Sequence, residues 1–224
     1  MSFNDRIEAG RILAAALAHH RQQPTVVLAL PRGGVMVAAE VARALGAPLG
    51  LLIVRKIGVP FQPELAMGAI VDGAAPVVVR NEDVITAAGV SATEFEAARE
   101  RELAEVERRR ARYLAGNDGP EVGGRVVIVV DDGIATGATM RAALQALRRR
   151  SPKSIVLAVP VAPPETVGAL RHEADEVVCL EQHRPFGSIG AFYADFRQVD
   201  DDEVIETLAR CAAATLPQRD PDAG

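Results

Sequence analysis

Two adjacent aspartates and a short run of small residues form the part of this 224-residue sequence best suited to chemistry. Asp131 and Asp132 follow an apolar, β-branched run, and a helix-like segment then opens with Ala135, Thr136, Gly137, Ala138 and Thr139. A helix N-terminus has unpaired N–H groups and partial positive charge, so this turn can bind a phosphate. The two carboxylates can accept hydrogen bonds from a vicinal diol, each worth about 1.5–3 kcal/mol. A diol beside a phosphate describes ribose 5-phosphate.

Residues 127–139 resemble the phosphoribosyl diphosphate motif of type I phosphoribosyltransferases, although a residue larger than Gly133 is usual there. The resemblance implies that Asp131 and Asp132 hold the ribose 2′ and 3′ hydroxyls and that residues 135–139 hold the 5′-phosphate. It also implies Mg²⁺ as cofactor. The ligand would carry the ion, with Asp131 and Asp132 as the candidates for a direct contact.

Two other folds with similar features fit less well. A receiver-type phosphorylation domain has its acidic pair after the first strand, whereas here the pair follows a late one. A dinucleotide-binding fold requires three glycines after the first strand, and Gly33 and Gly34 are only two.

The turn at residues 31–34 follows the first expected strand and resembles the family's pyrophosphate loop. Its candidate binding residues are Arg32, Gly33 and Gly34. The glycines allow close backbone approach and Arg32 supplies a cation. The resemblance also predicts a non-proline cis peptide between Pro31 and Arg32.

Residues 55–65 contain two prolines and a glycine and are expected to continue neither a strand nor a helix. They resemble the family's mobile catalytic loop, which closes over the reaction centre. Arg55 and Lys56 are therefore the candidate catalytic residues. Surface cations at a strand end are the alternative, and Glu64 could simply pair with one of them.

Residues 181–196 concentrate aromatic side chains and loosely resemble the hood that covers the acceptor base in purine-salvage members. Phe186 and Tyr193 are the candidates for stacking on a base, with His183 and Arg184 as further contacts. Packing of a loop is the alternative. Oxopurine-salvage members usually have an aspartate at the position of Ala135 and a lysine near Val161 and Ala162. Both are absent here, so the acceptor base stays open.

The elements that position these residues form an α/β pattern. Apolar runs at 25–30, 49–54, 125–130, 154–159 and 176–180 predict a Rossmann-like parallel sheet, with helices at 35–45 and 138–150. A last helix is expected after the acidic run 200–203 and ends near 214. Runs at 66–71 and 76–80 around Asp72-Gly73 predict a hairpin. A charged helix with a capping box is expected at 91–115. We expect one domain over 1–224, with a helical insertion at about 81–116 and a mobile tail at about 215–224.

Composition excludes several classes of protein. No stretch approaches eighteen apolar residues and no signal peptide is evident, so we expect a cytoplasmic protein without a membrane partner. The net charge of −5 argues against nucleic-acid binding. Cys179 and Cys211 have no partner at metal-ligand spacing and are expected to be buried free thiols.

Three functions fit these observations. The first is an enzyme that transfers the ribose 5-phosphate of phosphoribosyl diphosphate to a nitrogenous base, with Mg²⁺ and release of pyrophosphate, acting as a homodimer. The second is a regulator or sensor that binds such a ligand without transfer. The third is a hydrolase or phosphorylase acting on ribosyl phosphates.

Overall fold

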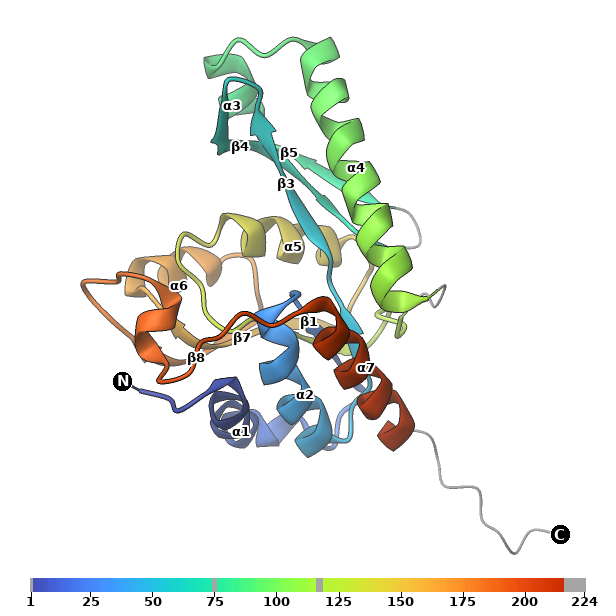
Figure 1. Ribbon diagram of the computed structural model, residues 1–224, viewed down its shortest axis with the longest axis vertical. Helices are drawn as coiled ribbons and strands as arrows, with labels where there is room; N and C mark the ends of the chain where they lie inside the picture. Colours follow the sequence, from blue (N-terminus) through green and yellow to red (C-terminus); the bar gives the residue numbers. More distant parts are fainter. Residues whose placement is uncertain (1, 74–75, 116–118, 216–224) are drawn as a thin grey trace, which may run out of the picture.

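The main sheet has five parallel strands and lies between two layers of helices (Figure 1). The computed structural model describes residues 2–73, 76–115 and 119–215. The strands follow the order β2-β1-β6-β7-β8. They are β1 (Thr25–Ala29), β2 (Leu49–Leu51), β6 (Val126–Val130), β7 (Ser154–Ala162) and β8 (Glu176–Gln182). The predicted parallel α/β fold is therefore confirmed.

Helices cover both faces of this sheet. α1 (Arg6–Ala16) and α2 (Gly33–Leu45) pack on one face, where α7 (Asp201–Thr215) lies against α2. α5 (Ala138–Arg148) and α6 (Pro164–Leu170) pack on the other. Every residue of β1 and β6 is buried. Burial on both faces explains why these strands are continuous apolar runs rather than alternating ones.

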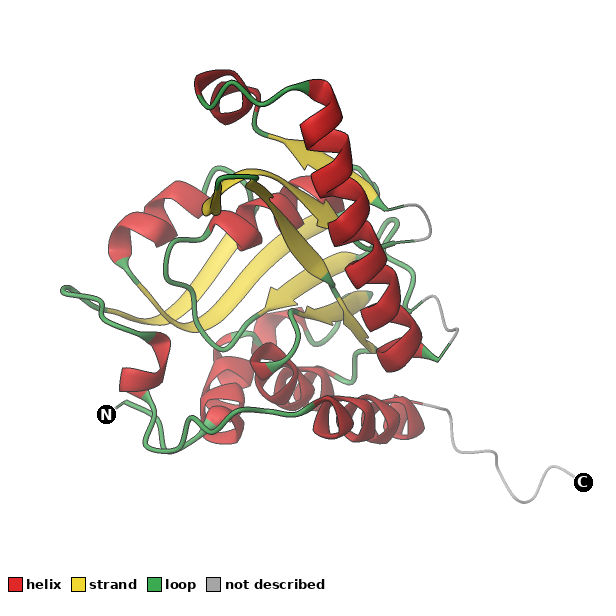
Figure 2. Ribbon diagram, turned by 45° about the horizontal axis from the view of Figure 1, so that its top comes forward, coloured by secondary structure: helices red, strands yellow, loops and turns green. Residues whose placement is uncertain are grey.

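A second sheet has three antiparallel strands in the order β3-β4-β5. They are β3 (Val54–Val59), β4 (Gln62–Val71) and β5 (Val77–Arg80). The hairpin predicted around Asp72-Gly73 is confirmed, since β4 and β5 pair there. α3 (Glu82–Ala87) follows β5, and α4 (Ala92–Leu114) crosses the outer face of this sheet (Figure 2). α5 packs against the same three strands and so connects the two sheets.

The charged helix α4 begins as predicted and is buried on one side. Ser91 and Glu94 form the expected capping box, and the Glu105–Arg109 pair is present at 2.7 Å. The side chains of Phe95, Val106 and Tyr113 are buried. One face of α4 is therefore part of the core, and only the other faces resemble the solvated helix that its charges indicate.

The prediction that residues 55–65 form neither strand nor helix is wrong. Residues 54–59 and 62–71 are strands β3 and β4, joined by a tight turn at Pro60 and Phe61. Pro63 fits because the pairing shifts register beside Gly58, where an added Cβ would lie 2.4 Å from the Pro63 carbonyl oxygen. A bulge of this kind admits a proline that a regular ladder excludes.

Other boundaries differ by small amounts. β2 ends at Leu51, three residues before the predicted end. Cys179 and Cys211 are thiols outside any disulfide, as predicted, but half-buried rather than buried. α7 includes residue 215, and the rest of the expected tail, 216–224, lies outside the described residues. In the described part of the chain, no helix has the length and apolar character needed to span a membrane.

Candidate functional site

The acidic pair lies at the carboxyl end of β6, directly against the turn that opens α2. An added Cβ on Gly33 would lie 1.9 Å from Oδ2 of Asp132, and one on Gly34 would lie 2.9 Å from Cα of Asp131. Only glycine therefore allows this approach of the two turns. The peptide bond between Pro31 and Arg32 is cis, as predicted.

The turn after the acidic pair presents free backbone donors at the start of α5. Gly137 is the N-cap residue, with a φ of 76° in the left-handed region that favours glycine, and no side chain caps this N-terminus. The flanking residues Ala135, Thr136, Ala138 and Thr139 are exposed. The hydroxyl of Thr166 donates to the Ala135 carbonyl at 2.7 Å and holds the turn against α6. The first N–H groups of α5 and two threonine hydroxyls are thus available to an anion.

Asp132 is bound by Arg6, a residue that sequence reasoning missed. Nε of Arg6 donates to Oδ2 of Asp132 at 2.7 Å, and both side chains are buried, at 10% and 12% exposed. Arg6 also donates to the Arg197 carbonyl at 2.9 Å and stacks on the ring of Phe196, 3.8 Å from its centroid. A single arginine in the first helix, 126 residues away from its partner, carries no sequence signal for this contact.

The two aspartates differ in environment. Burial, followed by the charge of Asp132, raises the pKa of Asp131 well above its usual value. Burial also raises the pKa of Asp132, although the hydrogen bond from Arg6 opposes this shift. Oδ1 of Asp131 accepts a hydrogen bond from the Asp132 backbone N–H at 2.9 Å. Among the described residues, Asp132 receives a hydrogen bond from a cationic side chain, that of Arg6, whereas Asp131 receives none from a cation.

Arg32 lies at the N-terminus of α2 and is half-exposed, with a guanidinium nitrogen 3.7 Å from an Asp201 carboxylate oxygen. The ion pair at this distance is loose and partly solvated. The guanidinium of Arg32 can therefore still donate hydrogen bonds to a ligand.

Arg55 and Lys56 are both on β3, and each is paired with a glutamate. Arg55 contacts Glu102 of α4 at 2.8 Å, and Lys56 contacts the exposed Glu64 at 3.0 Å. They line a cleft of about 400 Å³ between the β3–β4 hairpin and α4. Within the described residues, no hydrogen bond or ion pair connects either cation to Asp131, Asp132 or the α5 turn.

The aromatic segment after β8 packs mainly on itself and on the N-terminus. Tyr193 is 2% exposed, lies 5.4 Å from Phe3 between ring centroids, and donates its hydroxyl hydrogen to the Asp132 carbonyl at 2.5 Å. The expectation that Tyr193 offers its ring to a base is therefore not met in this structure. Its hydroxyl needs a buried partner, and Asp132 supplies it.

Phe186 is half-buried and lies 5.0 Å from Phe192, which in turn stacks on His183 at 4.6 Å. The cis Arg184–Pro185 bond precedes it. Ile189 of the short helix η2 (Ile189–Phe192) accounts for the small residue in the acidic turn, because a Cβ on Gly133 would lie 2.5 Å from it.

The fold and site define a parallel α/β protein with a phosphate-compatible helix N-terminus and a carboxylate pair at the carboxyl edge of its sheet, where such folds bind ligands. Residues 4–196 match the phosphoribosyl transferase domain. The chain belongs to this family, and the predicted family is confirmed.

Specific relatives agree with this assignment. The chain is 46% identical over 231 aligned residues to "Putative phosphoribosyl transferase Rv0571c" of Mycobacterium tuberculosis, covering 98% of this chain and 52% of the relative. A relative from a second strain of that species gives the same values. The chain thus spans about half the length of these curated relatives. It also resembles the crystal structure of TT1426 from Thermus thermophilus, with 41% identity, a TM-score of 0.83, and coverage of 94% of this chain and 99% of the other.

Proposed function

We propose that this protein transfers the ribose 5-phosphate group of phosphoribosyl diphosphate to a nitrogenous base and releases pyrophosphate. The observation that carries this proposal is the meeting of three features at one edge of the sheet. These are the carboxylate of Asp131, the uncapped N-terminus of α5 at Gly137, and the glycine turn at Gly33 and Gly34 that touches both aspartates.

Each part of the ligand has a matching group. The 5′-phosphate would accept hydrogen bonds from the first N–H groups of α5 and from the hydroxyls of Thr136 and Thr139. Asp131 would accept from a ribose hydroxyl. Asp132 has one carboxylate oxygen bound to Arg6, so it would offer its other oxygen. Arg32 and the first N–H groups of α2 would bind the pyrophosphate.

Mg²⁺ is the cofactor that the family implies, and the donor chemistry at Asp131 fits it. Carboxylate oxygens are ligands that Mg²⁺ prefers, and the ion commonly takes its other oxygens from substrate phosphates and water. Burial raises the pKa of Asp131, so keeping this carboxylate ionised costs free energy that a bound cation would offset. Asp131 would therefore hold the ion, which when bound would neutralise charge on the pyrophosphate.

In the reaction, the C1′–oxygen bond breaks, the electron pair leaves with pyrophosphate, and a base nitrogen forms the new bond to C1′ from the opposite face before losing its proton. The preorganised donors of Arg32 and the α2 turn would stabilise the leaving charge. Lys56 would contribute after exchanging Glu64 for pyrophosphate, which is feasible because Glu64 is exposed and its ion pair is weak.

The acceptor base is the open part of this proposal. Ala135 offers no carboxylate and the buried Val161 and Ala162 offer no lysine, so the polar groups that read an oxopurine in relatives are missing. The half-buried rings of Phe186 and Phe192 are the described candidates for stacking on a base.

A second candidate is a sensor that binds phosphoribosyl diphosphate without transferring it. The observation that favours it is the pairing of both Arg55 and Lys56 with glutamates. In this candidate the binding turn is used, Arg55 fastens the hairpin to α4, and Lys56 pairs within the hairpin.

Calorimetric titration with phosphoribosyl diphosphate and Mg²⁺ tests the binding step. Replacing Thr136 or Thr139 with Val removes a hydroxyl and keeps the side-chain shape, and should weaken binding about 10- to 100-fold. Thr86→Val, at an exposed site on α3, is the matched control and should change nothing. A screen of bases for pyrophosphate release then separates the two candidates. Absence of binding by the wild type would refute both.

A further inference from the structure

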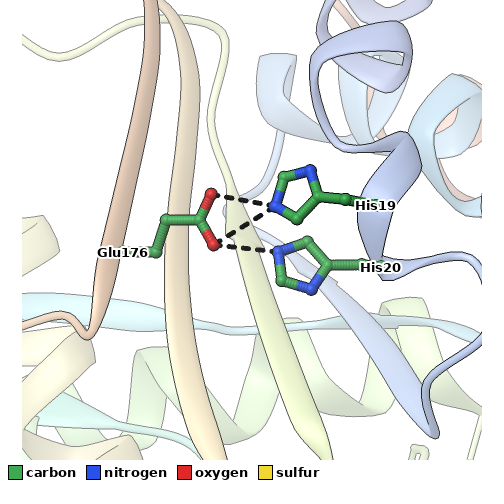
Figure 3. Close-up of side chains that lie close together, drawn as sticks. All are labelled: His19, His20 and Glu176. Carbon is green, nitrogen blue, oxygen red and sulfur yellow. Dashed lines mark hydrogen bonds and ion pairs between the residues drawn. The ribbon is translucent and has the colours of Figure 1, made fainter.

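Two adjacent histidines and a glutamate, His19, His20 and Glu176, lie close together (Figure 3). They are at the opposite end of the main sheet from the phosphate turn. His19 and His20 belong to the short helix η1 (Ala18–His20), which precedes β1, and Glu176 is the first residue of the edge strand β8. They therefore lie at the amino ends of parallel strands, whereas Asp131 follows a carboxyl end. Phosphoribosyl transfer, as proposed above, uses none of the three.

Each of the three side chains has one ligand atom close to those of the other two. Nε2 of His19 lies 3.1 and 3.4 Å from the two oxygens of Glu176, and Nε2 of His20 lies 3.0 Å from one of them. The three ligand atoms lie within 4.8 Å of one another. Bonds of 2.0–2.2 Å in a tetrahedral site separate neighbouring ligand atoms by about 3.3–3.6 Å. The separations of 3.0–3.4 Å between the histidine nitrogens and the Glu176 oxygens are thus close to those of a coordination sphere before any ion enters.

The surroundings hold this arrangement in place. His20 is 6% exposed, and its second ring nitrogen, Nδ1, lies 3.3 Å from the side-chain amide of Gln23. A histidine that ligates a metal through one nitrogen commonly has a hydrogen-bond partner on the other, which fixes the ring. When Nε2 of His20 binds a metal, its proton is on Nδ1. The Gln23 amide can then rotate so that its oxygen accepts a hydrogen bond from this Nδ1–H. The rings of His19 and His20 also contact each other, with centroids 4.1 Å apart and planes tilted by 42°.

We propose that His19, His20 and Glu176 bind a divalent first-row transition cation of the Zn²⁺ type. Two imidazoles and one carboxylate suit Zn²⁺ and its neighbours, whereas Mg²⁺ and Ca²⁺ prefer all-oxygen sites. The side chains of His19 and Glu176 are 53% and 36% exposed, which gives the ion a path from solvent and leaves room for water as a fourth ligand.

The position of the site indicates a structural role. His19 and His20 directly follow α1, and Glu176 begins the outermost strand of the sheet. An ion bound by all three would fasten the carboxyl end of α1 to β8, two segments more than 150 residues apart in the chain. Since a preformed site is absent from an unfolded chain, binding there stabilises the fold.

The test uses tag-free protein stripped of metal and titrated with Zn²⁺ by calorimetry. We expect one Zn²⁺ per chain at this site and, at a free concentration about 100 times the Kd, a rise in Tm of about 5–10 °C. Co²⁺ in place of Zn²⁺ should give the visible absorption of a tetrahedral nitrogen and oxygen site. Mg²⁺ should not compete with either ion.

Three variants locate the ion. His19→Ala and Glu176→Gln should each weaken Zn²⁺ binding roughly 100-fold or more, since loss of an outer partner alone costs 10–100-fold. Both replace partly exposed side chains, so the fold should survive. His172→Ala, at an exposed histidine outside the cluster, is the matched control and should bind like the wild type.

Three results would overturn the proposal. The first is no binding of Zn²⁺ at millimolar concentration, which would leave a purely hydrogen-bonded cluster. The second is unchanged affinity in both His19→Ala and Glu176→Gln. The third is loss of the bound ion in Asp131→Asn but not in His19→Ala, which would place the ion at the phosphate site.

Discussion

Arg6→Met is expected to destabilise the protein strongly, although Arg6 is a single charge near the N-terminus. The substitution keeps an unbranched side chain against Phe196 but leaves the carboxylate of Asp132 buried without its cation. Both side chains of the pair are about nine-tenths buried. Removing one partner of such a pair costs about 3–5 kcal/mol. For a chain of this length that lowers Tm by roughly 6–20 °C.

The assay is urea and thermal unfolding of Arg6→Met beside Arg11→Met. Arg11 lies on the same helix and pairs with Glu40 at 3.1 Å, but its side chain is 65% exposed. An exposed pair contributes about 0–1 kcal/mol, so the control should unfold close to the wild type. The double variant Arg6→Met with Asp132→Asn should recover part of the loss, because it removes the unpaired charge.

Equal stability of Arg6→Met and Arg11→Met would refute this reasoning. It would mean that water solvates the Asp132 carboxylate, so that burial does not make the loss of Arg6 costly. A double variant no more stable than Arg6→Met would show that the loss comes from packing on Phe196.

Three further predictions concern the site itself. Asp131→Asn should weaken phosphoribosyl diphosphate binding yet raise the free energy of unfolding in urea. Burial raises the pKa of this carboxyl in the folded state, so its ionised form destabilises the fold. The gain in stability is therefore full at pH values above the raised pKa and is lost as the pH falls through it. Gly33→Ala should lower Tm and weaken ligand binding, because its Cβ would meet Asp132 at 1.9 Å, whereas Gly168→Ala, inside α6 with open space around it, should stabilise by about 0.5–1 kcal/mol. Lys56→Ala should lower kcat and kcat/KM together in steady-state kinetics with little change in Tm; a rise in KM alone would assign it to ground-state binding.

Local sequence was sufficient for the elements whose cause is local. The continuous valine-rich run of β6 predicted a buried strand, and the Ser91 and Glu94 spacing predicted the start of α4. The turn at Gly137 was found because small residues between a strand and a helix allow an uncapped helix N-terminus. The family was also predicted correctly from this segment.

Predictions failed where a contact distant in the chain overrode local preference. Residues 55–65 were predicted to form a loop because they contain Pro60 and Pro63. A bulge at Gly58 allows this segment to pair as strands β3 and β4. Tyr193 was predicted to stack on a base because aromatic faces stack. In the structure its ring is buried and its hydroxyl donates to the Asp132 carbonyl.

The sequence alone determined the class of fold, the family and the phosphate-compatible turn, because these follow from hydrophobic period, glycine placement and helix-terminal chemistry within short segments. Only the tertiary structure decided which charges meet. Arg6 reaches Asp132 across 126 residues, and His19 reaches Glu176 across 157. Such partners carry no mutual signal in one chain, because their approach depends on how the helices and strands pack rather than on the residues beside each of them.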